Sequence, residues 1–148
     1  MKRCASHWRF VAAGCLTVLG TAAGAANLAV TVDNIEEDKG VLRVAVYKEP
    51  NWLDEDSKNV TAGKVYDLTE RRGDEPVVVN LDLEPGEYGA VVYHDVNTNN
   101  QFDKNLLGIP KEPYAFSLCA SKFRRPKFEE CKFEVGEDGA AITLSFKE

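Results

Sequence analysis

Oxygen-bearing side chains recur at every second position in one short stretch of the chain, His94 to Asn105, which reads HDVNTNNQFDKN. In the calcium-loop pattern D-x-[DN]-x-[DN]-G, oxygens at positions one, three, five, seven and nine surround the ion. Five residues with amide or carboxylate oxygens occupy those positions here: Asp95, Asn97, Asn99, Gln101 and Asp103. The spacing predicts a candidate calcium site.

The end of this loop departs from the full pattern. Position twelve, which should be a glutamate that binds the ion through both oxygens, is Leu106, so only two carboxylates remain. Affinity would then be low, with a dissociation constant near ~10⁻⁴ to 10⁻³ M. Glu112, or the acidic residues at 54–56, are candidates to complete the shell. A metal-free loop is the alternative, because Asn and Asp also bond their own backbone and tolerate left-handed geometry.

His94 immediately precedes the loop and is the only histidine after residue 25. Alternation places it on the face of Tyr88 and Val92, which indicates a buried, hydrogen-bonded histidine that supports the loop. A hydrolase centred on His94, with Ser117 as nucleophile, is an alternative, but no nucleophile elbow accompanies them. One histidine and two cysteines are too few ligands for zinc. We expect no enzymatic activity.

A basic run with interleaved phenylalanines lies later in the chain. It could hold an anionic ligand such as a phosphate or an acidic glycan, or it could pair with nearby carboxylates at the surface. Its cationic members are Lys122, Arg124, Arg125 and Lys127.

Residues 1–25 have the pattern of a secretory signal peptide: basic residues, then an apolar stretch, then the small-residue site Ala23-Gly24-Ala25. A membrane anchor is the alternative, but the apolar stretch is diluted by glycine and threonine and falls short of a span of about 20 residues. Lipidation at Cys15 is a third reading. The sequence predicts export to the periplasm or exterior of a bacterium, with no membrane span after cleavage.

Removal of the leader makes the chain strongly acidic. The sequence has 18 basic and 24 acidic residues, and the leader carries three of the basic ones, so residues 26–148 have a formal charge of −9. Binding to nucleic acid or to an anionic lipid surface needs a basic footprint, which this charge argues against. The unidentified partner would then be a protein or a glycan.

Cys119 and Cys131 are the only cysteines after the leader. In an oxidising compartment such an isolated pair predicts a structural disulfide.

Apolar residues alternate with polar ones at period two through most of residues 26–148, which predicts strands over 28–32, 41–46, 77–83, 88–94, 131–135 and 142–146, with a weaker one at 63–69. We expect the first two strands to form a hairpin through the turn at 36–40, and the last two to form another. About seven short strands in one domain indicate an all-β antiparallel sandwich of immunoglobulin-like or prealbumin-like type. Tyr88, after a Pro-Gly turn, predicts a tyrosine corner or a plain core aromatic.

The stretch LEPGEYGAVVYHDVNTNNQFDKNLLGIPKEPYAFS, followed by RRPKFEECKFEV, resembles the bacterial exported family known as domain-of-unknown-function family twenty-one forty-one. Asn100 stands where that family usually has glycine, and the cysteine pair is an addition. The resemblance implies the fold and export, and it implies no activity. We therefore expect a binding or structural module with a weak calcium loop, and the alternative is a metal-free module that contacts a protein or a glycan.

Overall fold

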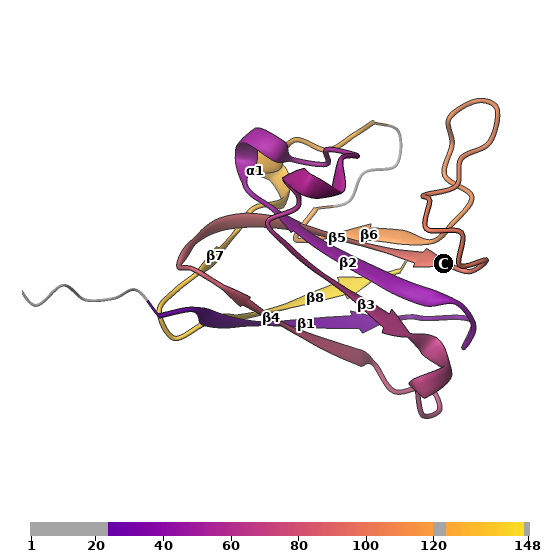
Figure 1. The fold of residues 1–148 in the computed structure, drawn as a ribbon, viewed down its shortest axis with the longest axis horizontal. Helices are drawn as coiled ribbons and strands as arrows, with labels where there is room; N and C mark the ends of the chain where they lie inside the picture. The colour runs from indigo at the N-terminus through magenta and orange to yellow at the C-terminus, as the bar shows by residue number, and fades with distance from the viewer. Residues whose placement is uncertain (1–23, 120–123, 147–148) are drawn as a thin grey trace, which may run out of the picture.

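Eight strands in two facing sheets form the part of the chain that the computed structural model describes, residues 24–119 and 124–146 (Figure 1). The three-stranded sheet has the order β4 (Val77–Leu83), β1 (Ala26–Asp33), β8 (Ala140–Ser145). The five-stranded sheet has the order β3 (Ala62–Asp67), β2 (Val41–Tyr47), β5 (Gly86–Asp95), β6 (Tyr114–Phe116), with β7 (Phe133–Val135) also paired to β5. The all-β sandwich that the sequence predicts is confirmed, with eight strands rather than seven.

Short helical turns connect some of these strands: η1 (Glu49–Asn51), η2 (Ser57–Asn59), η3 (Leu68–Glu70) and α1 (Phe128–Cys131). In the described part of the chain no helix has the length and apolar character needed to cross a membrane. The predicted signal peptide, with Cys15, lies almost wholly in residues 1–23, outside the described residues.

The core lies between the two sheets and follows the alternation of the strands. On β1 and β4 every second residue is buried, and the buried residues of β1, β2, β4, β5 and β8 form one apolar cluster. This pattern is the expected result of one apolar face per strand. β5 pairs with β2, β6 and β7, which confirms its prediction as a central strand.

Both predicted hairpins are wrong in their pairing. β1 pairs with β4 and, in parallel, with β8, whereas β2 pairs with β3 and β5 in the other sheet. At the other end Gly136 and Gly139 form a bridge, but β7 joins β5 and β8 joins β1. A strand can bury its apolar face in the core from either sheet. The alternation therefore predicts which side chains are buried, but it does not predict which strand lies beside it.

Two aromatic side chains, Tyr88 and Trp52, stabilise the outer parts of the sandwich. The Tyr88 hydroxyl is buried and donates to the Glu84 carbonyl oxygen at 2.7 Å, which confirms the tyrosine corner. The indole of Trp52 packs over Gly89, where a Cβ atom would lie 2.4 Å from the ring. Trp52 also donates to the Pro126 carbonyl oxygen at 2.8 Å, so it covers the outer face of β5 rather than filling the core.

Cys119 and Cys131 are joined by a disulfide, as the sequence predicts. The bridge links the segment after β6 to α1. Beside it, the Ser117 hydroxyl donates to the Cys131 carbonyl oxygen at 2.6 Å and accepts from the Ala90 amide at 2.9 Å. Ser117 therefore links α1 to β5 through its hydroxyl.

Candidate metal-binding loop and the pocket beside it

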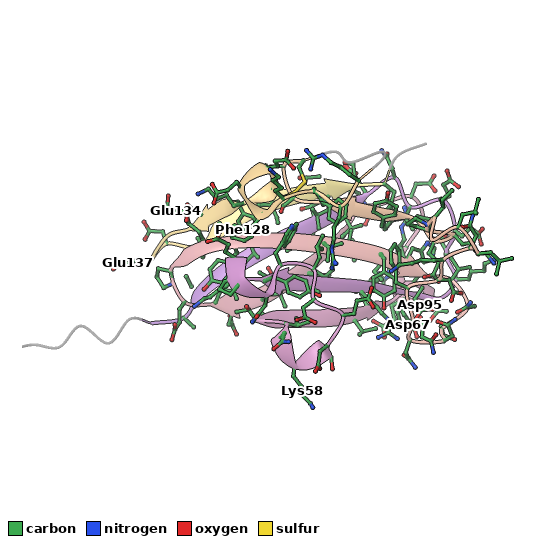
Figure 2. All side chains as sticks on the ribbon, turned by 90° about the horizontal axis from the view of Figure 1, so that it is seen from above. Lys58, Asp67, Asp95, Phe128, Glu134 and Glu137 are labelled. Atoms are coloured by element: carbon green, nitrogen blue, oxygen red, sulfur yellow. A yellow bond between two sulfur atoms is a disulfide. The ribbon has the colours of Figure 1, made fainter. Side chains whose placement is uncertain are left out.

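The predicted calcium loop begins where β5 ends. Asp95 is the last residue of β5, and it lies at the same end of the molecule as Asp67, opposite the end that carries Glu137 (Figure 2). Residues 96–113 then form the long connection from β5 to β6, which projects beyond both sheets (Figure 1).

The Asp95 carboxylate is buried and has three donors. It accepts from Arg43 Nε at 2.9 Å and from the backbone amides of Asn99 at 3.1 Å and Asn100 at 3.0 Å. Burial raises the pKa of Asp95, but the bonds from Arg43 and the two amides outweigh it, so the pKa lies below its usual value. Asp95 is therefore ionised, and its hydrogen bonds stabilise the fold of the loop.

The backbone follows the calcium-loop pattern in its first half. The residue at position one accepts from the amides of positions five and six, and position six, Asn100, has a left-handed φ of 66°. Glycine is usual at that position because it adopts positive φ without strain, and asparagine is the next most tolerant residue. Arg43 also bonds the side chain of Asn100. The departure from glycine is therefore accommodated.

Asn97, Asn99 and Asp103 converge on one another, apart from Asp95. The amide nitrogen of Asn97 donates to Asp103 at 2.8 Å, and that of Asn99 lies 3.1 Å from both Asp103 oxygens. Their side-chain oxygens instead accept backbone amides of the loop. The amide nitrogens therefore occupy the side of Asp103 that a cation would approach. Gln101 is exposed.

Glu112 lies under the same loop and is only 7% exposed. Its Oε2 accepts from the Asp103 backbone amide at 3.1 Å, whereas its Oε1 is buried without a hydrogen-bond partner. Burial raises the pKa of the Glu112 carboxyl, and the nearby carboxylates of Asp95 and Asp103 raise it further. The backbone amides of Asp103 and Val96 oppose this rise, but the pKa stays above its usual value. A buried carboxylate oxygen without a partner is rare, because it loses its hydration and gains nothing in return.

His94 is buried and hydrogen-bonded, as the sequence predicts. Its Nε2 lies 2.6 Å from the Lys39 carbonyl oxygen and its ring stacks on Phe146. Gly40, with φ of +75°, allows this close approach, because a Cβ there would lie 2.3 Å from the Asp95 carbonyl oxygen. His94 thus ties the 34–40 connection to the base of the loop. The hydroxyl of Ser117, the alternative nucleophile, is bonded to Cys131 and Ala90 instead.

These residues border a pocket of about 530 Å³ between the loop and the 34–40 connection. Its lining combines acidic side chains with one histidine, one lysine and one asparagine: Glu36, Glu37, His94, Val96, Asn97, Asp103, Lys111, Glu112 and Pro113. Among the described residues, no three His, Cys, Asp or Glu side chains gather closely enough to hold a metal ion by themselves. A cation here would therefore need amide, carbonyl or water oxygens as well.

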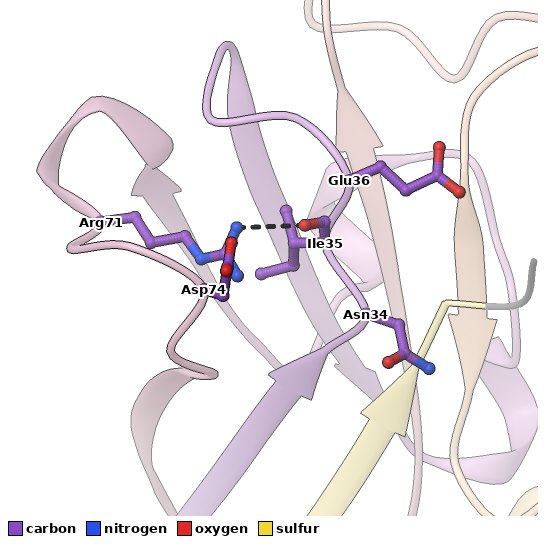
Figure 3. Close-up of a pocket in the computed structure, with 5 residues that line it drawn as sticks. All are labelled: Asn34, Ile35, Glu36, Arg71 and Asp74. Atoms are coloured by element: carbon purple, nitrogen blue, oxygen red, sulfur yellow. Dashed lines mark hydrogen bonds between the residues drawn. The ribbon is translucent and has the colours of Figure 1, made fainter.

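A second, smaller pocket of about 270 Å³ lies on the other side of the 34–40 connection (Figure 3). Arg71 crosses it and donates to the Ile35 carbonyl oxygen at 3.1 Å and to Asp38 at 2.7 Å. It also donates to the Glu75 carbonyl oxygen at 2.9 Å. The guanidinium therefore holds the connection in place.

The basic run is divided. Lys122 lies outside the described residues. Arg124 pairs with Glu130, which lowers the pKa of that carboxyl to about 2 together with the Lys127 backbone amide. Arg125 and Lys127 are exposed. The Arg124 pairing is the surface arrangement that the sequence offered as the alternative to an anion site.

Sequence reasoning missed Arg43, Glu36 and Glu37. Arg43 is the one charged residue in an otherwise apolar strand, which could have marked it as the partner of a buried acid. Nothing in the sequence placed Glu36 and Glu37 beside a loop some sixty residues later.

A family model described as an uncharacterized protein conserved in bacteria (DUF2141) covers residues 30–143, which is most of the chain. No curated protein and no solved structure matches.

Proposed function

Since the chain belongs to this family of uncharacterised bacterial proteins, which assigns it no activity, we propose from its geometry that it is an exported binding module with a weak site for calcium. The site lies in the pocket beside the loop. Export is supported by the pattern of residues 1–25. The candidate ligands are Asp103, Glu112 and Asn97, and binding requires the side-chain amides of Asn97 and Asn99 to turn away from Asp103.

One observation carries this proposal, the unpartnered Oε1 of buried Glu112. Glu112 lines a pocket that Asp103 and Asn97 also border. A divalent cation would provide Oε1 with the partner that it lacks and would offset the repulsion between the two carboxylates. Calcium suits such a set best, because it accepts six to eight oxygens in flexible geometry, whereas magnesium demands a near-ideal octahedron.

Glu112 in this arrangement takes the role of the missing position twelve. Leu106 stands at that position in the sequence, but the loop folds so that the Glu112 carboxylate bonds the amide of Asp103, which is position nine. Asp95 then organises the loop through Arg43 and backbone amides and does not bind the ion directly. With two carboxylates the dissociation constant should fall near ~10⁻⁴ to 10⁻³ M.

The experiment is calcium titration by isothermal calorimetry on the chain that begins at Ala26. We expect saturable binding at millimolar calcium, weaker binding of magnesium, and at least a tenfold loss of calcium affinity in D103N. The matched control is D67N at the same end of the molecule, since Asp67 bonds Thr69 within its own turn. Absence of saturable binding at 10 mM calcium, or equal affinity in D103N, contradicts the proposal.

A metal-free interaction module is the second candidate, and the bonding of the loop favours it. Arg43 and the loop amides satisfy Asp95, and the amides of Asn97 and Asn99 satisfy Asp103, so the loop holds its shape without an ion. In that case the same end of the sandwich would contact a protein or a glycan directly. The calcium titration separates the two candidates.

A further inference from the structure

The outermost part of the β5–β6 connection is a small ordered hairpin. Lys104 and Pro110 form a bridge at its base, and the Asn105 amide donates to the Ile109 carbonyl oxygen at 2.8 Å. The Asn105 side-chain oxygen accepts the amides of Leu107 at 2.9 Å and Ile109 at 3.0 Å. These bonds fix the turn without burying any of its side chains.

Three large apolar side chains extend from this turn into solvent. Leu106 is 106% exposed, Leu107 84% and Ile109 56%. We call Leu106–Ile109 the apolar tip. Single exposed apolar residues are ordinary on protein surfaces, but three within four residues on a projecting turn indicate an interaction site.

The tip is convex. It lies at the end of a connection that projects beyond both sheets (Figure 1). Protein partners are usually recognised through a broad patch centred on aromatic or arginine anchors, and the tip has neither. A narrow aliphatic projection is better suited to insertion into a lipid layer than to contact with a flat protein surface.

The charges around the tip fit a phospholipid surface. Lys104 and Lys111 are both exposed, one on each arm at the base of the hairpin. Lys104 has an exposed ion pair with Glu55 at 3.0 Å, which holds it only weakly. Lysines at this level can extend toward phosphate groups while the aliphatic side chains enter the acyl boundary, about 5–10 Å deep.

We infer that the apolar tip inserts into the surface of a phospholipid bilayer and so places the sandwich against a membrane. The acidic body of the protein gives no general attraction to anionic lipid, so the contact is hydrophobic and occurs on a zwitterionic surface. The turn is already ordered by its own hydrogen bonds, so insertion carries little ordering entropy. Nothing in this contact requires calcium.

The test uses the chain from Ala26 and vesicles of pure phosphatidylcholine, with a chelator present so that the calcium site plays no part. We expect the protein to float with the vesicles, and the fraction bound to persist in 0.5 M salt, since hydrophobic contact is not screened. L106S/L107S should weaken the partition at least tenfold. V65S/V78S, which removes two exposed apolar side chains from strands, should leave it unchanged.

A second measurement reports insertion directly. In L107W the added indole lies at the tip, so vesicles should shift its fluorescence to shorter wavelength, whereas Trp52 stays packed on the sandwich. Absence of flotation by the unmodified chain, or equal flotation of L106S/L107S, overturns the inference. So does a concentration-dependent dimer in sedimentation velocity that L106S/L107S abolishes, because a second copy would then be the occupant.

Discussion

Replacement of Glu112 by glutamine should change the stability of the protein in opposite directions with and without calcium. The substitution keeps the shape of the side chain and the acceptor for the Asp103 amide. It replaces the charged carboxylate, whose Oε1 has no partner, with an uncharged amide. Without calcium, the variant should therefore be more stable than the unmodified protein, because a buried charge beside two other carboxylates is removed.

The magnitudes follow from the burial and the expected affinity. A buried polar group without a partner costs about 1–3 kcal/mol, and we expect E112Q to recover about 1 kcal/mol of this in chelator, since Oε2 already has the Asp103 amide as its partner. At 10 mM calcium, a dissociation constant of ~10⁻⁴ to 10⁻³ M stabilises the unmodified protein by about 1.4–2.7 kcal/mol through mass action. In a domain of this size each kcal/mol corresponds to roughly 3–5 °C in Tm.

The assay is thermal unfolding followed by circular dichroism, in chelator and at 10 mM calcium. E112Q should melt roughly 3–5 °C higher than the unmodified protein in chelator and should gain little from calcium. The control is E134Q, an exposed glutamate at the opposite end of the molecule (Figure 2), which should respond to calcium as the unmodified protein does. Equal calcium responses in E112Q and the unmodified protein would refute a role of Glu112 as ligand.

The pH dependence checks the same reasoning. The folded-state pKa of Glu112 is raised, so its contribution to stability is fully present below the ordinary glutamate pKa of about 4.3 and is lost as pH rises through the raised value. In chelator, the advantage of E112Q should be largest near neutral pH and should shrink as pH falls toward this window. An advantage that does not vary with pH would mean that the charge of Glu112 is not its cause.

Three further outcomes follow from the fold. Y88F should lower the free energy of unfolding by about 1 kcal/mol in urea titration, because it removes the hydrogen bond to the Glu84 carbonyl oxygen, and an unchanged midpoint would count against the tyrosine corner. G89A should lower the free energy of unfolding by about 1–3 kcal/mol, because its Cβ would clash with the Trp52 ring. A shift in the indole fluorescence of Trp52 should accompany this destabilisation. Reduction of the disulfide should lower the free energy of unfolding by roughly 3 kcal/mol in the chain-entropy model, and an unchanged urea midpoint in reductant would count against a stabilising role of the bridge.

The sequence predicted best what depends on local chemistry. Alternation identified the faces of β1, β4 and β5, because a strand exposes its side chains at period two wherever it lies. The Pro-Gly turn before Tyr88 indicated the tyrosine corner as one of two readings, and it could do so because the bond spans only four residues. The burial of His94 followed from the same alternation.

Prediction failed where distant segments decide the outcome. The pairing of β1 with β4 and β8 instead of β2 depends on the direction in which the 34–40 connection leaves the sheet, and Arg71 holds that connection from more than thirty residues away. The partner of Asp95 is likewise Arg43, on a neighbouring strand. Such contacts have no local signature, so the candidate site could be located from the sequence but its bonding could not be worked out.

The parallel pairing of β1 with β8 has a consequence for how the chain folds. Asn34, just after β1, donates to the carbonyl oxygen of Phe146, which lies 112 residues later and follows β8. Closing so large a loop is slow, and proteins dominated by such contacts fold in milliseconds to seconds. When the chain is delivered amino-terminus first, β1 has to wait for β8, so the three-stranded sheet cannot close until β8 has emerged. Until then the exposed edge of β1 is available to other chains, and a chaperone that protects it should raise the yield of folded protein.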